Sequence, residues 1–192
     1  MKRKILSKLI EWKNKKNRKP LIVNGARQVG KTYILKEFGS HYYEKMAYVN
    51  CDKNKTLDKI FSQDYNISRI LLSLSAILHV NIEPENTLII FDEIQENPTV
   101  LNSLKYFCED ASQYHVAVAG SLLGISLHRD TSFPVGKVDM IKMYPMTFDE
   151  FLMAIDEQPL VDVLASKDFS IIDSLSVRLI DRLRQYYYVG GM

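Results

Sequence analysis

Apolar residues along this chain follow two patterns, and the alternation between them predicts the fold class. Short, continuous apolar runs typical of strands buried in a parallel sheet occur at residues 21–24, 46–51, 87–91 and 115–119. Stretches with the three-and-four spacing of a helix lie between and after them, at residues 31–38, 56–62, 67–80 and 98–110. Residues 138–143 alternate and give a fifth strand. The order predicts an α/β fold of three layers, with a mainly parallel sheet between two helical layers.

Both ends of the chain are predicted to be helical. Apolar residues at residues 5–12 have helical spacing, and Pro20 is expected to end that first helix. Gly39 is expected to end the helix that begins at Lys31. The final segment has helical patterns at residues 147–155, 160–165 and 171–188.

We therefore divide the chain into a basic N-terminal helix (1–19), a central core (20–146) and a helical lid or bridge (147–192). Because the chain stops at Gly190-Gly191-Met192, directly after an aromatic helix end, we expect a longer protein with a further C-terminal domain.

Charge is distributed unevenly. Residues 1–19 carry nine Lys or Arg and one Glu, whereas the other 173 residues carry 16 Lys or Arg and 22 Asp or Glu. A basic helix of this kind could contact nucleic acid or an acidic surface. The favoured interpretation is a solvated helix whose apolar side packs on the domain while its lysines face water. No apolar run approaches the ~20 residues of a membrane span, and no export signal follows the basic start.

Two cysteines, Cys51 and Cys108, lie in apolar segments and form neither a disulfide framework nor a zinc motif, which favours a cytoplasmic location. The four histidines, His41, His79, His115 and His128, share no metal-ligand spacing. The run of tyrosines at 186–188 is expected to form a buried seam rather than a platform for stacking bases.

The clearest chemical motif lies between the first strand and the helix after it. Residues 25–32 read GARQVGKT and match the pattern G-x-x-x-x-G-K-[ST]. Two glycines allow a tight turn whose N–H groups point inward, and the following helix directs its positive end at the same place. Lys31 can reach the β- and γ-phosphates of a nucleotide, and the Thr32 hydroxyl can bind Mg²⁺. The alternative is a glycine turn with a surface lysine. The predicted nucleotide-binding residues are Gly25, Ala26, Arg27, Gln28, Val29, Gly30, Lys31, Thr32 and Tyr33.

Two carboxylates end the apolar strand at residues 87–91. Because the carboxyl ends of parallel strands meet at one edge of a sheet, Asp92 is expected to lie near Thr32 and to bind Mg²⁺ through its water shell. Glu93 is placed to polarise the water that attacks the γ-phosphate. A pair of solvated carboxylates is the alternative for these two. Asp52, after the second strand, could reach the same shell, but a solvated role is favoured.

These segments together resemble the AAA-type (AAA+) ATPases, and in particular a prokaryotic family of uncharacterised ATPases. The resemblance covers nearly the whole chain and rests on the segments NGARQVGKT (24–32), FDEIQ (91–95), AGS (119–121) and YPMTFDEF (144–151). It implies that Ser121 senses the γ-phosphate, although Ser121 could instead, or also, cap a helix at residues 122–127. It also implies a longer chain whose additional domain selects the partner.

Such families often carry an arginine just before the fifth strand, where this chain has Lys137. Lysine lacks the planar fork of arginine, so a finger role for Lys137 is in doubt. Arg129, Arg178, Arg182 and Arg184 are the other candidates for a sensor or finger, and the sequence does not select among them.

The function predicted first is an ATP-binding domain that hydrolyses ATP with Mg²⁺ to drive or gate a conformational change, with Lys31, Glu93 and Ser121 as the catalytic residues. The alternatives are a slow switch in which ATP sets the arrangement of a further C-terminal domain or of a homo-oligomer, a module that contacts nucleic acid through residues 1–19, and a P-loop transferase. ATP is preferred to GTP because no guanine-reading segment follows a strand.

Overall fold

The structure, a computed structural model, describes residues 3–121 and 134–191, and within them one parallel sheet organises the chain. The strand order is β2-β3-β4-β1-β5, and all four pairings are parallel. The strands are β1 (Leu21–Gly25), β2 (Lys45–Asn50), β3 (Thr87–Asp92), β4 (His115–Ser121) and β5 (Asp139–Met143). The α/β fold expected from the sequence is confirmed, and the sheet is entirely parallel over these strands.

Burial follows strand position in the sheet. Strands β1, β3 and β4 are buried along their whole length, as their continuous apolar runs predict. Strands β2 and β5 lie at the two edges and have mixed burial. Successive side chains of each strand enter opposite layers, so Ile22 packs with one core cluster while Leu21 and Val23 pack with the other.

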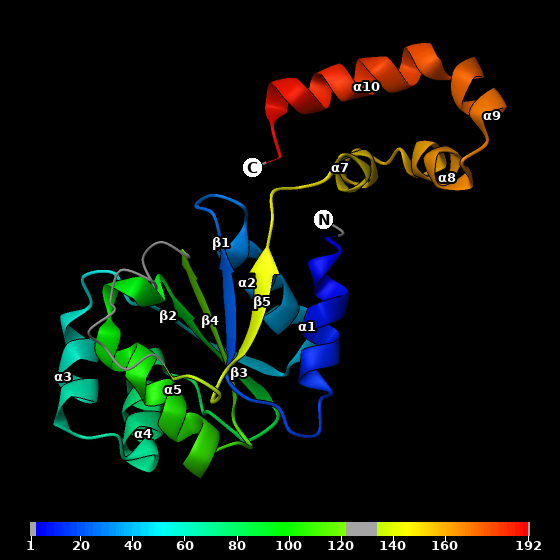
Figure 1. Cartoon of the computed structure of the whole chain (residues 1–192). Helices are drawn as coiled ribbons and strands as arrows, with labels where there is room; N and C mark the ends of the chain where they lie inside the picture. Colours follow the sequence, from blue (N-terminus) through cyan, green and yellow to red (C-terminus); the bar gives the residue numbers. More distant parts are fainter. Residues whose placement is uncertain (1–2, 122–133, 192) are drawn as a thin grey trace.

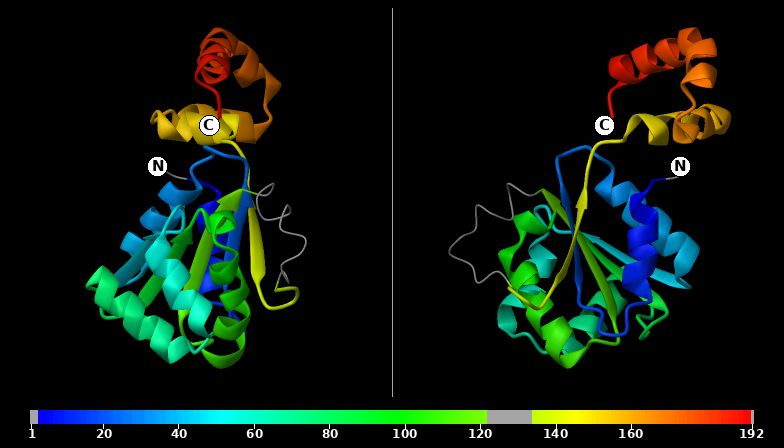
Figure 2. Two further views of the ribbon diagram at one scale, coloured as in Figure 1. Left: turned by 90° about the vertical axis from the view of Figure 1, so that its left-hand side faces the viewer. Right: turned by 45° about the vertical axis from the view of Figure 1, so that its right-hand side comes forward.

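Helices cover both faces of the sheet (Figures 1 and 2). Helices α1 (Ile5–Lys13) and α2 (Lys31–Tyr42) form one layer over a core that includes Trp12 and Phe38. Helices α3 (Lys55–Gln63), α4 (Ile67–Leu78) and α5 (Pro98–Asp110) form the other, over a core that includes Phe61 and Phe107. The result is the three-layer arrangement predicted from the sequence.

Helix boundaries follow local side-chain chemistry. Asn54, Asn66 and Asn97 cap α3, α4 and α5, because each side-chain oxygen accepts a bond from a backbone N–H in the first turn. A short 3₁₀ helix, η1 (Ile94–Glu96), which the sequence did not predict, lies between β3 and α5.

Beyond β5 the chain forms four helices, α7 (Phe148–Ala154), α8 (Gln158–Ser166), α9 (Phe169–Ser174) and α10 (Ser176–Val189). They extend from the sheet as an arm that turns back on itself (Figure 1). The arm has a small core of its own, in which Leu152 and Leu160 are buried and Tyr186 packs against Phe148 and Phe151. No helix in the described residues is long and apolar enough to cross a membrane.

Several sequence expectations were wrong in detail. The first helix ends at Lys13 rather than near Pro20, with Asn14 as its C-cap and the Trp12 indole N–H donating to the carbonyl of Lys19 (2.8 Å). Helix α2 continues through Gly39 to Tyr42, and a Cβ at Gly39 would lie 2.8 Å from Met46 Sδ on β2. This glycine permits close helix–strand packing and ends nothing.

The last predicted helix is two helices, α9 and α10, which meet at Leu175. Tyr187 and Tyr188 are exposed, so only Tyr186 of the tyrosine run belongs to a buried seam.

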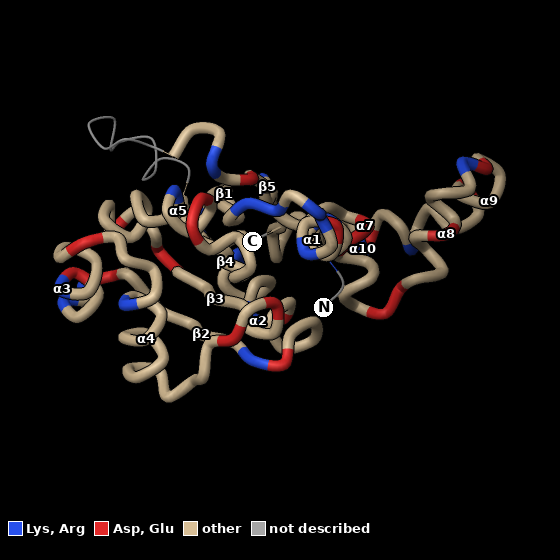
Figure 3. Tube along the Cα trace, turned by 90° about the horizontal axis from the view of Figure 1, so that it is seen from below, with Lys and Arg blue, Asp and Glu red and all other residues tan. Residues whose placement is uncertain are grey.

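Most basic side chains of the N-terminal segment form bonds within the protein. Lys and Arg gather along α1 and the turns after it (Figure 3). Most of those in the described part are bonded to the protein: Arg3 to Glu150, Lys4 to Asp149, Lys13 to the carbonyl of Tyr42, Lys15 to Asp139, Arg18 to the carbonyl of Lys13 and Lys19 to the carbonyl of Gly136. Ile5, Leu9 and Trp12 of α1 are buried. This arrangement agrees with the interpretation as a packed, solvated helix.

Candidate functional site

The phosphate loop connects β1 to α2 at the carboxyl edge of the sheet. Gly25, the last residue of β1, has no room for a side chain, because a Cβ there would overlap the carbonyl oxygen of Met143 on β5. Gly30 has φ 90° and precedes the first residue of α2, and Gln28 has φ 65°. The left-handed conformation at Gly30 is one that glycine adopts without strain. The loop therefore needs both glycines of the motif, each for a different reason.

The Lys31 ammonium folds back over the loop. Its Nζ donates to the carbonyl oxygens of Ala26 (2.6 Å) and Gly25 (3.2 Å). Burial lowers the pKa of Lys31, as does the nearby Arg27 charge, while the Glu93 and Asp92 carboxylates act in the opposite direction. The ammonium thus contacts the loop backbone and lies within electrostatic reach of the two carboxylates at the end of β3.

Thr32 and Asp92 are in direct contact. The Thr32 hydroxyl donates to Asp92 Oδ2 at 2.8 Å, which joins the loop motif to the carboxylate motif across 60 residues of sequence. Tyr48 on β2 donates to the same oxygen at 3.0 Å, and the Glu93 N–H donates to Asp92 Oδ1 at 3.0 Å. Asp92 is only 5% exposed, so its carboxylate is held by three donors in a nearly dry position. The burial of Asp92 rules out a freely solvated carboxylate at that position, whereas Glu93 is exposed.

Glu93 is linked to the end of β4 by one side chain. Glu93 has φ 51°, and the Gln95 side-chain amide donates to Glu93 Oε2. The carbonyl oxygen of the same amide accepts the N–H of Ser121 at 3.3 Å. Ser121 lies opposite Gly25 in the β1–β4 register. Three strand ends thus meet here, carrying Gly25, the two carboxylates and Ser121.

A cavity of about 410 Å³ adjoins the phosphate loop. Its wall includes the apolar side chains of Val29, Ile34, Met143 and Met146, and also Tyr33, which is half exposed. A depression of about 590 Å³ along α10 is larger but is lined by residues 174–185 alone, with no loop residue. The cavity beside the loop, in contrast, is lined by the loop residues Gln28, Val29 and Gly30.

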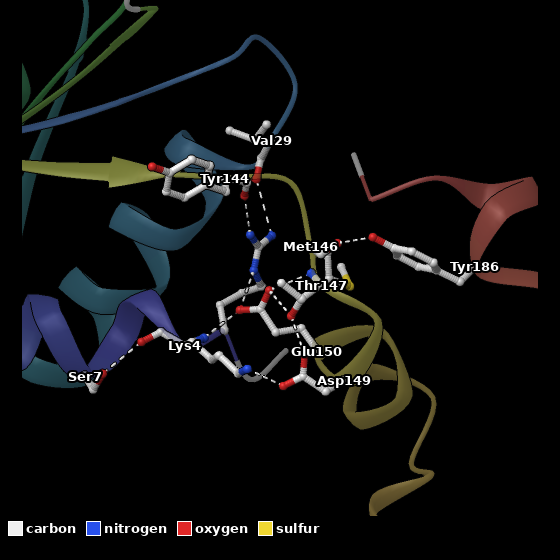
Figure 4. A network of polar contacts seen from close by, with 10 residues as sticks. Lys4, Ser7, Val29, Tyr144, Met146, Thr147, Asp149, Glu150 and Tyr186 are labelled. Atoms are coloured by element: carbon white, nitrogen blue, oxygen red, sulfur yellow. Dashed lines mark hydrogen bonds and ion pairs between the residues drawn. The ribbon is translucent and has the colours of Figure 1, made fainter. Parts of the chain in front are cut away.

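A buried ion pair connects the loop to the helical arm (Figure 4). Arg3 donates to Glu150 Oε1 (3.3 Å), to the carbonyl of Tyr144 (2.8 Å) and to the carbonyl of Val29 in the phosphate loop (3.4 Å). Glu150 also accepts the backbone N–H groups of Lys4 (2.7 Å) and Thr147 (2.9 Å). α1, the loop and the start of α7 are therefore fixed to one another through two side chains.

The other candidate residues lie elsewhere. Lys137 precedes β5 and so lies at the amino ends of the parallel strands, whereas the loop lies at their carboxyl ends. It pairs with Glu109 (2.8 Å). Arg178 and Arg182 both bond Glu157 inside the arm, and Arg184 pairs with Asp181. Asp52 is exposed. His128, Arg129 and the predicted helix at residues 122–127 fall outside the described residues. Within the described residues no group of acidic, His and Cys side chains could hold a metal ion by itself.

Sequence reasoning missed four residues of this region. Tyr48 gives no signal, because tyrosine is common in strands. Gln95 follows the carboxylates in the motif but carried no role there. Arg3 was one of nine cations in its segment. Glu150 could have been found, because Thr147 and Glu150 form the capping box of α7 and have its sequence signature.

The fold and site define a class: a parallel α/β sheet whose first strand leads through a glycine loop into a helix, with an acidic strand end beside it, is a P-loop nucleotide-binding domain. Residues 17–152 match the model of a family described as AAA domain, which spans more than half of the chain. The chain belongs to that family of AAA-type P-loop ATPase domains.

Solved structures with a similar fold include the Aeropyrum pernix ORC2 protein in ADPNP-ADP complexes (18% identity, TM-score 0.45) and Caenorhabditis elegans PCH-2 (12% identity, TM-score 0.48). The alignments cover 81% and 78% of this chain but only 49% and 44% of those proteins, so the chain spans about half their length or less. No curated protein matches the chain.

Proposed function

We propose that this domain binds ATP with Mg²⁺ and hydrolyses it. The observation that carries the proposal is the 2.8 Å contact between the Thr32 hydroxyl and Asp92 Oδ2 beside the Lys31 ammonium. It brings together the three groups that a phosphate chain and its cation require. Family membership supports nucleotide hydrolysis in general, and the residue roles below are our assignments.

The phosphates are assigned to the loop at residues 25–32. The backbone N–H groups of the loop and of the first turn of α2 cradle anionic oxygens. The Lys31 ammonium exchanges its two loop carbonyls for β- and γ-phosphate oxygens. Burial and the Arg27 charge lower the pKa of Lys31, while the neighbouring Glu93 and Asp92 carboxylates favour its charged form.

Mg²⁺ fits the donor set at the end of β3. The Thr32 hydroxyl offers one direct oxygen ligand and the buried Asp92 carboxylate can accept hydrogen bonds from metal-bound waters, so the other positions would be left to water and phosphate, which is the usual pattern for this ion. When bound, the ion would neutralise charge on the β- and γ-phosphates. Thr32 would hold it directly, and Asp92 would hold its water shell.

Glu93 is assigned the general base and Ser121 a contact to the γ-phosphate. Glu93 follows Asp92 directly, and Ser121 ends the strand between β3 and β1. Gln95 holds the Glu93 carboxylate and the Ser121 N–H at once, which fixes the base relative to the strand end. The water molecule to be activated would lie between these groups and the phosphate.

The base and ribose are assigned to the 410 Å³ cavity. Its apolar wall suits a flat aromatic base, and it opens beside the loop that holds the phosphates. The exposed Tyr33 ring stands at its margin.

Nucleotide occupancy is proposed to move residues 147–192, which we treat as a lid or bridge on a core at residues 20–146. Support comes from Arg3 and Glu150, which connect the loop carbonyl of Val29 to α7. Gly191, at the other end of the arm, also lines the cavity. A change in the loop therefore has two short routes into the arm.

The test is steady-state phosphate release with matched variants. Lys31→Ala should abolish Mg²⁺-dependent ATP uptake in calorimetry. Glu93→Gln should keep uptake and lower turnover by about 10²-fold or more. Turnover that survives Glu93→Gln unchanged, or uptake that survives Lys31→Ala, would end the proposal.

A slow nucleotide-regulated switch is the second candidate. It is favoured by the ion pairs of Arg178 and Arg182 with Glu157, because arginines that are paired within the arm have no role at the phosphates in this arrangement. Rapid turnover by a monomer, measured after size-exclusion chromatography, would contradict it.

A further inference from the structure

The Asp92 carboxylate has a donor that neither motif contains. Tyr48 lies on the edge strand β2, opposite Ile90 of β3 and two residues before Asp92 in register. Because side chains alternate along strands, Tyr48, Ile90 and Asp92 point into the same layer, the one covered by α2. The β2–β3 register thus places the Tyr48 hydroxyl beside the Asp92 carboxylate, although β2 carries neither motif.

The contact is specific to one oxygen. Tyr48 Oη donates to Asp92 Oδ2 at 3.0 Å, the same oxygen that accepts the Thr32 hydroxyl. Burial, followed by the hydrogen bond to Asp92, raises the pKa of Tyr48 to about 12, so the phenol remains a donor at neutral pH. Oδ1 is held from the other side by the Glu93 N–H. Removing Tyr48 Oη would take away one of the two side-chain hydroxyls that hold Oδ2 and would loosen the orientation of the carboxylate.

The Tyr48 ring is itself held in place. The Lys36 ammonium lies 3.5 Å from the ring centroid, a cation–π contact. Lys36 is on α2, one helical turn after Thr32. The same helix that carries the metal-binding hydroxyl therefore also clamps the phenol.

We infer that Tyr48 is a positioning residue of the magnesium site, which orients the Asp92 carboxylate toward the hydrated ion. The inference rests on the proposed function, in which Asp92 holds the metal's water shell. Outer-shell partners of this kind set metal affinity without touching the ion. Tyr48 is not expected to contact the nucleotide, and this separates its role from that of the loop.

The experiment measures metal affinity apart from nucleotide affinity. Calorimetry on the full chain follows a non-hydrolysable ATP analogue, first in EDTA and then at a series of Mg²⁺ concentrations. Tyr48→Phe should bind the analogue in EDTA as the unchanged chain does, but need about 10-fold more Mg²⁺ to reach half of the Mg²⁺-dependent gain in affinity. Tyr48→Met, a second variant without the hydroxyl, should show the same loss.

Tyr43→Phe is the matched control. It also removes a partly buried tyrosine hydroxyl on this layer, one that bonds His115 rather than Asp92. Its Mg²⁺ dependence should stay that of the unchanged chain. An unaltered Mg²⁺ dependence in both Tyr48 variants would overturn the inference and leave the proposed function standing. So would a loss in EDTA as large as the loss with Mg²⁺, which would indicate a merely structural role. No Mg²⁺-dependent gain in the unchanged chain would remove the proposed function and this inference together.

Discussion

The buried pair of Arg3 and Glu150 should contribute strongly to stability, and only as a pair. The two side chains are 5% and 6% exposed, so neither charge can be rescued by water if the other is removed. Deleting one partner of a buried pair typically costs about 3–5 kcal/mol. For Arg3→Met we expect about 3 kcal/mol, the low end, because Glu150 keeps the N–H groups of Lys4 and Thr147.

Glu150→Gln should cost a similar amount, since Arg3 would keep only two carbonyl acceptors. The double variant should then be little worse than either single one. This gives a coupling energy of roughly 2–3 kcal/mol in a double-mutant cycle.

Urea unfolding measures this cycle, followed by circular dichroism and by fluorescence of Trp12, the only tryptophan. Lys4→Met is the control, because the Lys4–Asp149 pair is exposed on the lysine side (62%) and should be worth less than about 1 kcal/mol. Additive single effects, with a coupling below about 0.5 kcal/mol, would refute the reasoning.

The same pair gives a pH signature. Burial raises the pKa of Glu150. The N–H groups of Thr147 and Lys4 and the Arg3 charge together lower it by more than burial raises it, so the net pKa is below its usual value. The stability that it contributes is therefore present above the unfolded pKa of about 4.3 and is lost as pH falls through the lower folded pKa. Glu150→Gln should lack this part of the acid loss.

Three further outcomes can be tested. Burial, aided by the Arg18 and Lys13 charges, lowers the pKa of His115 to about 3. Between pH 7 and pH 5 His115 therefore becomes protonated in the unfolded chain but stays neutral in the folded chain. Stability should fall by roughly 2 kcal/mol more between pH 7 and pH 5 than in His115→Phe, measured by urea unfolding. Cys108 should react with a thiol reagent before Cys51, which is 1% exposed and whose pKa burial raises to about 12; equal rates would contradict this. Gln95→Met should lower kcat for ATP about tenfold with little change in KM, since it releases the proposed base without touching the phosphate loop, and an unchanged kcat would count against it.

The central sheet and the nucleotide motifs could be predicted because both depend on local patterns. Continuous apolar runs marked β1, β3 and β4, and the spacing of Gly25, Gly30 and Lys31 marked the tight turn between β1 and α2. The meeting of Thr32 with Asp92 also followed, because parallel strands end at a common edge.

What could not be predicted depends on contacts between distant segments. Gly39 looks like a helix end in sequence, and only the position of Met46 shows that a glycine within α2 lets the helix and β2 pack closely. Tyr48 reaches Asp92 through the β2–β3 register, which the sequence does not specify. Arg3 is one cation among many until the fold buries it beside Glu150.

The return of the chain from α10 has a mechanical consequence. The Gly191 carbonyl accepts the N–H of Met146 at 2.6 Å, and a Cβ at Gly191 would crowd the Met146 backbone. Both residues line the cavity beside the phosphate loop. A displacement of α10 would therefore be transmitted to the cavity beside the phosphate loop, because the helical arm is closed at both ends rather than attached at one.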